Sequence, residues 1–243
     1  MRLDFIVPGA QKSGTTALHY FLSKHSGIAL PDRQEMHFFD DEEIFSRPVD
    51  YQLLHRHFGP VAKGAVAGEV TPSYLYWEPA MERIRNYRPE IKLLILLRNP
   101  IDRAFAHWNM QRFKDREPLD FLPALKEEPL RIAQPLSIES RRFAYVDRGF
   151  YSVQLERVFS LFPRKQVKLV KFEDFRDRKQ ETLDQIFDFL GVKRLRIASD
   201  KDRNVVPYER AMTGEERKYL LDVFSAEITK LEQMLRWDLK DWR

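Results

Sequence analysis

The polar residues best suited to chemistry are gathered early in the chain, where one cation and several hydroxyl groups lie within five residues. They are Lys12, Ser13, Gly14, Thr15 and Thr16. An apolar run at 3–7 precedes them and a helical pattern at 18–22 follows, which predicts a strand, a glycine-bearing loop and a helix. In such a loop backbone N–H groups converge on an anion, and the helix N-terminus adds partial positive charge. The stretch therefore predicts an anion-binding loop; the alternative is a plain strand–turn–helix whose hydroxyl groups only cap the helix.

The glycines of this stretch, Gly9 and Gly14, have the spacing of the nucleotide-triphosphate loop G-x-x-x-x-G-K-[ST]. The pattern breaks at the next position, because Thr15 stands where that loop has its lysine, and the lysine lies earlier, at Lys12. The sequence therefore predicts an anion loop that differs from a standard ATP- or GTP-binding loop.

A second cation follows the most apolar run of the chain. Residues 92–97 are almost wholly aliphatic, which is typical of a strand buried on both faces of a parallel sheet, and Arg98 comes directly after them. Ligands of such sheets bind at the carboxyl ends of the strands, so Lys12 and Arg98 are expected to belong to one site. The alternative for Arg98 is an ordinary surface ion pair.

An apolar segment at 34–40 carries two further ionisable groups, Glu35 and His37. In an extended segment residues two apart face the same way, so the imidazole can orient the carboxylate or act as a base itself. The alternative is an exposed glutamate beside a buried, hydrogen-bonded histidine, and spacing by itself leaves both interpretations open.

Composition limits the class of protein. The 243 residues are 43% hydrophobic, include no cysteine, and carry a net charge of +4 from 41 basic and 37 acidic residues. Disulfides and cysteine chemistry are therefore excluded, and the balanced charge predicts no nucleic-acid partner. No apolar run reaches the ~20 residues of a membrane span, and the first strand starts directly after Met1, which leaves no room for a signal peptide. We expect a single domain over residues 1–243, either a cytoplasmic protein or a domain cut from a larger chain.

Strand and helix patterns alternate along the chain. Strands are expected at 3–7, 28–30, 65–70, 92–97 and 167–172. A first helix is expected from the 18–22 pattern to about residue 25, and another after Pro100 through Phe113. Further helices are expected at 51–58, 79–87, 152–162, 180–190 and 214–236, whereas residues 115–140 give no clear pattern. The alternation predicts an α/β fold in which a central parallel β-sheet is flanked by helices and carries the P-loop-like anion loop.

Three segments make the chain resemble a known family. They read QKSGTT at 11–16, EMHFFD at 35–40 and LILLRNPIDR at 94–103. With these motifs and their spacing the chain resembles the sulfotransferases that use 3′-phosphoadenosine 5′-phosphosulfate (PAPS), on the branch of the heparan sulfate sulfotransferases and related bacterial enzymes. The similarity extends over nearly the whole chain, including a Gly149-Phe150-Tyr151 helix start.

The resemblance implies a role for each motif. In the family the first loop holds the 5′-phosphosulfate, with Lys12 at the sulfonate and the residues after it giving backbone and hydroxyl donors, here Ser13, Gly14, Thr15, Thr16 and Ala17. Arg98 corresponds to the arginine on the 3′-phosphate, for which a planar guanidinium is well suited. Glu35 matches the general base of the heparan-type enzymes, with His37 as its partner or as the base. The product would be 3′,5′-adenosine bisphosphate (PAP), and no metal is required.

Further contacts follow from the same resemblance. A loop late in the chain would close over the nucleotide with Arg203, Asn204 and Tyr208. Glu69 is a candidate acceptor contact, with a charge at the sheet edge as the alternative, and Phe39 and Trp108 are further candidates because of their position near the segments between the motifs.

Two positions depart from the family pattern. Relatives usually carry a serine on the 3′-phosphate where this chain has Ala106, so a neighbour such as Arg103 or His107 would have to replace it. Val70 stands where glycan sulfotransferases have an active-site lysine, which indicates a different acceptor or a redistributed charge.

The leading hypothesis is sulfuryl transfer from PAPS to an acceptor hydroxyl or amine, on a glycan or a small natural product. One alternative is a P-loop-type small-molecule kinase, which the displaced lysine disfavours. Another is a non-catalytic nucleotide- or glycan-binding module, which Ala106 and Val70 keep open. The sequence does not indicate the acceptor or an oligomeric state.

Overall fold

The computed structural model describes residues 2–196 and 207–243, which fall into two compact units. One unit comprises Met1–Leu97 and Arg157–Asn204, and the other comprises Arg98–Glu156 and Val205–Arg243. The single-domain organisation expected from the sequence stays a prediction.

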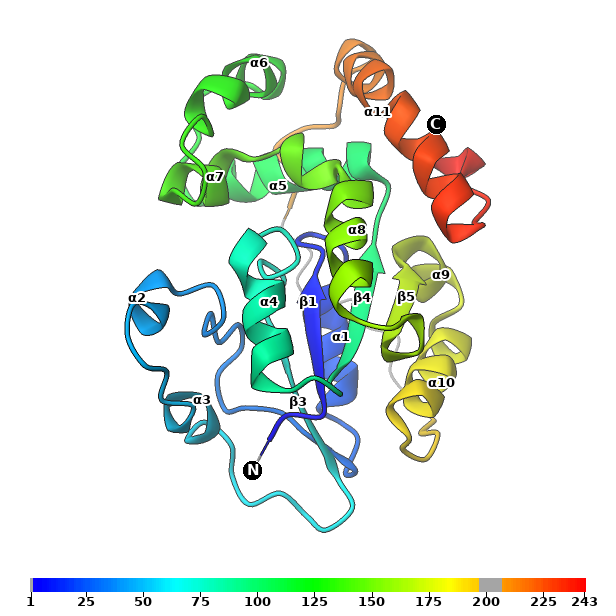
Figure 1. Ribbon diagram of the computed structural model, residues 1–243. Coiled ribbons are helices and arrows are strands. Elements are labelled where there is room, and N and C mark those ends of the chain that lie inside the picture. The colour runs from blue at the N-terminus through cyan, green and yellow to red at the C-terminus, as the bar shows by residue number, and fades with distance from the viewer. Residues whose placement is uncertain (1, 197–206) are drawn as a thin grey trace. The chain divides into compact units, whose positions relative to one another are not determined.

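The first unit is built on a five-stranded parallel sheet (Figure 1). Its strands are β1 (Phe5–Gly9), β2 (Ile28–Ala29), β3 (Val66–Val70), β4 (Lys92–Leu97) and β5 (Val167–Lys171), in the spatial order β2-β3-β1-β4-β5. The registers place Val7 beside Val70 and Leu96 beside Val170. The predicted α/β fold with a central parallel sheet is therefore confirmed.

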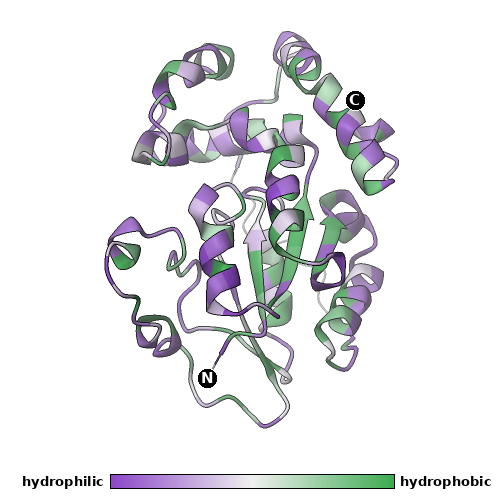
Figure 2. Cartoon of the chain, viewed as in Figure 1, coloured by the Kyte–Doolittle hydropathy of each residue, from purple (hydrophilic) through white to green (hydrophobic). Residues whose placement is uncertain are grey.

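Helices cover both faces of this sheet. The helices of this unit are α1 (Thr15–Leu22), α2 (Glu42–Phe45), α3 (Gln52–His55), α4 (Glu78–Tyr87), α9 (Phe172–Asp177), α10 (Lys179–Leu190) and the short η2 (Arg164–Gln166). Leu94 and Leu96 of β4 pack in one buried cluster with apolar residues of α1, α9 and α10. Helix α4 lies on the opposite face (Figure 1), and the strands between the two helical layers are hydrophobic throughout much of their length (Figure 2).

The second unit is helical. It contains α5 (Pro100–Phe113), α6 (Phe121–Arg131), α7 (Ile138–Phe143), η1 (Asp147–Gly149), α11 (Gly214–Leu235), η3 (Lys240–Trp242) and most of α8 (Tyr151–Leu161). Its buried side chains include Trp108, Phe121, Tyr145 and Phe224. Among the residues described here, no helix is both long and apolar enough to span a membrane.

Two stretches differ from the sequence-based expectation. Residues 115–140 form α6 and α7, whose pattern is obscured by prolines. Pro123 lies in the first turn of α6, where a missing N–H costs nothing, and Pro129 lies inside the helix. The helix expected at 51–58 shortens to the single turn Gln52–His55.

Candidate functional site

The predicted anion loop joins β1 to α1. Strand β1 ends at Gly9, the N–H of Ala10 donates to the carbonyl of Leu96 at 2.7 Å, and α1 starts at Thr15. Gly14 caps the helix with φ +86°, so its backbone lies in the left-handed region that glycine favours. A Cβ on Gly14 would also lie 2.9 Å from the ring of Phe172. The loop therefore needs a glycine here for two reasons.

The loop holds donors that fit an oxyanion. Within the described residues no side-chain cap bonds the N-terminus of α1, and its first turn holds no acidic residue, which suits this helix end to an anion. The hydroxyl of Ser13 is wholly buried and has no hydrogen-bond partner among residues 2–196 and 207–243. A buried hydroxyl without a partner is costly, and a bound oxyanion would supply the missing acceptor. With the ammonium of Lys12, this set of donors fits a phosphosulfate group.

A turn after β3 is anchored against the base of this loop. The N–H of Thr71 donates to Val7 at 3.1 Å, and the N–H of Leu75 donates to Pro8 at 2.8 Å. Gly9 permits this approach, because a Cβ there would meet the Cβ of Leu75 at 2.8 Å. The 71–75 turn is therefore placed by the same strand that carries the anion loop.

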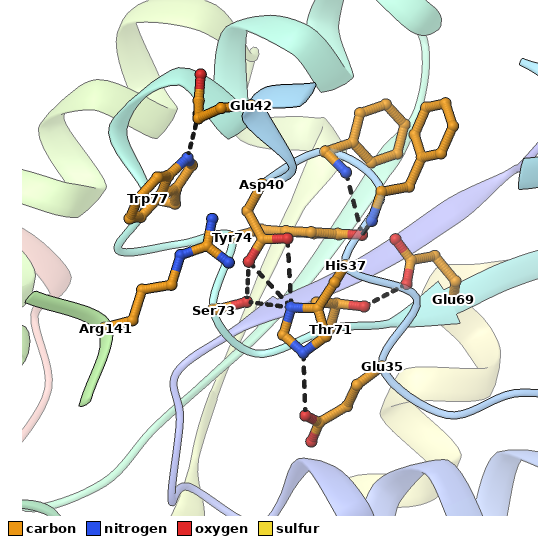
Figure 3. A network of polar contacts seen from close by, with 12 residues as sticks. Glu35, His37, Asp40, Glu42, Glu69, Thr71, Ser73, Tyr74, Trp77 and Arg141 are labelled. Atoms are coloured by element: carbon orange, nitrogen blue, oxygen red, sulfur yellow. Dashed lines mark hydrogen bonds and ion pairs between the residues drawn. The ribbon is translucent and has the colours of Figure 1, made fainter. Parts of the chain in front are cut away.

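The same turn supports Glu35 and His37, which the structure brings together (Figure 3). The Nε2 of His37 lies 3.6 Å from an oxygen of Glu35, and its Nδ1 lies 3.1 Å from Asp40. The Ser73 hydroxyl donates to Asp40 at 2.5 Å. Asp40 is wholly buried, whereas the Glu35 side chain is 48% exposed. Half of Glu35 therefore stays open to a substrate.

The two carboxylates hold His37 in its charged form. Hydrogen bonds to Asp40 and then to Glu35 raise the pKa of His37 to about 9. At neutral pH both ring nitrogens therefore carry protons and act as donors. A protonated imidazole cannot accept a proton, so at neutral pH His37 is a donor in this network.

The backbone of the segment is unusual at the residues of interest. Glu35 and His37 both have φ +52°, and Lys12 has φ +67°, a region that side chains other than glycine rarely adopt. Glu35 and His37 do come together as expected, but the segment is not extended at these two residues, because both have left-handed backbone angles. Such strain persists only where the surroundings impose it, and it is concentrated at functional sites.

Contacts from other elements impose this conformation. The hydroxyl of Tyr74 accepts the N–H of Phe38 at 2.9 Å, and Arg83 donates to the carbonyl of Phe39 at 3.0 Å. The rings of Phe38 and Phe39 are buried in an aromatic cluster with Phe45, Tyr51, Tyr74 and Tyr87. Phe39, a predicted acceptor contact, lies within this cluster.

Glu69 lies at the end of β3, wholly buried. The Thr71 hydroxyl donates to one of its oxygens at 2.7 Å, and burial raises its pKa to about 7. Its predicted contact with an acceptor stays a prediction.

The second unit contains Arg98, Trp108 and Tyr208. Arg98 precedes α5, and its carbonyl accepts a hydrogen bond from Tyr151 at 3.0 Å. Tyr208 is 43% exposed and stacks on Phe105 at 5.5 Å. Trp108 is 1% exposed, and its indole N–H donates to Leu119. Arg203 and Asn204 lie outside the described residues.

The neighbours of Ala106 are turned to the interior of this unit. Arg103 and His107 are both wholly buried, and Arg103 donates to the carbonyl of Tyr145. Because both side chains are buried inside the unit, neither is exposed to bind a phosphate in place of the missing serine.

A cavity of about 420 Å³ lies apart from the predicted residues, where α1, β2 and residues 59–65 meet. Its lining includes His19, Ser23 and Pro31, and burial lowers the pKa of His19. In the described part of the chain, no cluster of three or more His, Cys, Asp or Glu side chains is arranged to hold a metal ion.

A parallel sheet flanked by helices, with a predicted anion loop after β1, is typical of phosphate-binding α/β folds. Comparison with known proteins identifies the family within this class. The sulfotransferase domain family matches residues 2–204, so the chain belongs to that family. A crystal structure of a sulfotransferase from Alicyclobacillus acidocaldarius shares 31% identity at TM-score 0.83, covering 100% of this chain and 99% of that one.

More distant relatives agree with this family. The human bifunctional heparan sulfate N-deacetylase/N-sulfotransferase 2 is 27% identical over 213 residues, covering 81% of this chain and 24% of that protein. A mouse sulfotransferase solved in complex with PAP shares the fold at TM-score 0.58 and 16% identity, covering 95% of this chain and 85% of that one. The chain spans 66% of the length of a Dictyostelium discoideum relative and 24% of the human one.

The network also contains a residue that sequence reasoning missed. Asp40 is the buried partner of His37, and Ser73 orients it from a distant part of the chain. The signal available in the sequence was the position of Asp40 three residues after His37, at the end of the EMHFFD motif.

Proposed function

We propose that the protein is a sulfotransferase that moves a sulfuryl group from PAPS to an acceptor hydroxyl or amine, with Glu35 as the general base. The observation that carries the proposal is the β1–α1 loop, where Lys12, the buried Ser13 hydroxyl and the first turn of α1 form a donor set for a phosphosulfate. Membership of the sulfotransferase domain family supports it.

When bound, PAPS supplies the sulfuryl group and leaves as PAP. Lys12 and the N–H groups of the loop stabilise the negative charge that grows on the leaving phosphate oxygen as the S–O bond breaks. Ser13 to Ala17 hold the 5′-phosphosulfate, and Arg98 holds the 3′-phosphate with help from Arg203, Asn204 and Tyr208. No step in this scheme calls for a metal.

Glu35 takes the proton from the acceptor as the new bond to sulfur forms. Its exposed half can reach an acceptor hydroxyl, and a base must lie within hydrogen-bond distance of the proton it removes. Protonated His37 forms an ion pair with Glu35 at 3.6 Å and so orients the carboxylate, while buried Asp40 keeps the imidazole charged.

The acceptor is proposed to be a glycan or a small natural product. Val70, in place of the lysine of the glycan enzymes, removes a cation next to buried Glu69. We therefore expect less dependence on an anionic acceptor than in those relatives.

The decisive experiment supplies the purified protein with PAPS and a panel of acceptors and measures PAP release. Lys12→Ala should lower turnover by about 10²–10³-fold, because it removes a preorganised donor to the leaving group. The exposed Lys63→Ala is the matched control and should keep full turnover. Full turnover by Lys12→Ala would remove Lys12 from the mechanism. Binding of ATP with Mg²⁺ and no binding of PAP would instead favour a kinase.

A further inference from the structure

Arg98 is held from behind by a hydrogen bond to its backbone. Tyr151, the first residue of α8, is wholly buried, and its hydroxyl donates to the carbonyl of Arg98 at 3.0 Å. Asn99 then caps α5 by accepting the N–H of Ile101 at 2.9 Å. These contacts fix the backbone on both sides of the Arg98–Asn99 peptide.

The start of α8 reaches this turn because of Gly149. A Cβ on Gly149 would lie 2.5 Å from the ring of Phe224 and 3.2 Å from the Cβ of Pro100. The glycine therefore lets the chain before α8 pack against the first turn of α5. This gives the Gly149-Phe150-Tyr151 motif a physical reason that spacing along the sequence does not reveal.

The short helix η3 closes the other side of Tyr151. Trp242 is wholly buried, and its ring lies 6.4 Å from that of Tyr151 in an edge-to-face arrangement. The amide of Asn99 points to the carbonyl of Asp241 at 3.5 Å, and Arg243 pairs with Glu232 of α11 at 2.7 Å. The Tyr151 hydroxyl is thus held in place by packing from a distant segment.

We propose that Tyr151, backed by Trp242, is the positioning residue that sets recognition of the 3′-phosphate. The proposal rests on the proposed function, in which Arg98 binds that phosphate. A guanidinium binds an oxyanion best through paired hydrogen bonds, so a small shift of its backbone weakens that contact. The 5′-end of the nucleotide is held by the β1–α1 loop, so its binding does not depend on the position of the Arg98 backbone.

The test compares the affinity for PAP with that for adenosine 5′-monophosphate, which lacks the 3′-phosphate, by calorimetry. In Tyr151→Phe we expect the dissociation constant for PAP to rise about 5–10-fold, as loss of one hydrogen bond implies. The constant for the monophosphate should change by less than about twofold. Trp242→Ala should show the same selective loss, to a larger extent.

Tyr145→Phe is the matched control. Tyr145 is also wholly buried in the second unit, and its hydroxyl donates to Glu117 at 2.8 Å. Its loss should leave the ratio of the two affinities unchanged. If Tyr151→Phe keeps the wild-type ratio, or lowers both affinities equally, the inference is overturned. If the wild-type protein does not prefer PAP to the monophosphate, the proposed donor itself is wrong.

Discussion

The anion loop and the segment at 35–40 are built by opposite means. The loop is a backbone structure, with a strand before it, a helix after it and glycines where the chain bends sharply. The 35–40 segment has no regular secondary structure and is held by side chains from elsewhere, among them Ser73, Tyr74 and Arg83. The difference teaches that two parts of the candidate site should tolerate substitution very differently.

The largest effect is expected at Glu35, where substitution should lower activity without lowering the stability of the fold. Glu35→Gln should lower turnover by about 10²–10⁴-fold, because it removes the proposed general base. Its side chain is half exposed, so the melting temperature should hardly change. The assay is PAP release beside thermal unfolding, with the exposed Glu43→Gln as the control. Turnover within threefold of wild type would exclude Glu35 as the base.

Substitution of Asp40 is expected to change both the pKa of His37 and the stability of the fold. Asp40→Asn removes the buried partner of His37, so it should lower the pKa of His37 from about 9 and destabilise the fold by about 1–3 kcal/mol. Because the folded pKa of His37 is raised, its stabilisation is complete below about pH 6.5 and is lost as the pH rises through 9.

Titration of the His37 ring by NMR checks this, together with unfolding at pH 6 and pH 10. The difference in stability between wild type and Asp40→Asn should be smaller at pH 10. A wild-type His37 that titrates near pH 6.5 would contradict the charged network.

The smallest effect is expected at Gly14 of the loop, and two glycines outside the loop, Gly64 and Gly59, separate the effect of backbone angle from that of close packing. Gly14 has φ +86° and lies close to the ring of Phe172. Gly64 has a similar φ of +83° but no atom near the position of a Cβ, and Gly59 has neither a positive φ nor a close atom. Urea unfolding of the alanine variants should show a loss of about 2 kcal/mol at Gly14 and about 1 at Gly64, with almost none at Gly59. Equal losses at Gly14 and Gly64 would mean that contact with Phe172 does not constrain the loop.

The same contrast explains what the sequence could predict. The strand–loop–helix around Lys12 and the strand before Arg98 follow from local patterns, because hydrophobic periodicity and glycine placement are encoded over a few residues. The role of Asp40 could not be predicted in this way, because its partner Ser73 lies 33 residues away. The backbone before Asp40 also has left-handed angles at Glu35 and His37, which local sequence preferences do not favour. Helices α6 and α7 were obscured by prolines in and around them.

The place of β1 in the sheet has a consequence for how the protein folds. Both neighbours of β1 come later in the chain, β3 at Val66–Val70 and β4 at Lys92–Leu97. Pairing β1 with these distant parallel strands requires a long stretch of chain to close into a loop before the strands make contact. The strand that leads into the Lys12 loop therefore has both of its neighbours only after the chain through Leu97 has been made.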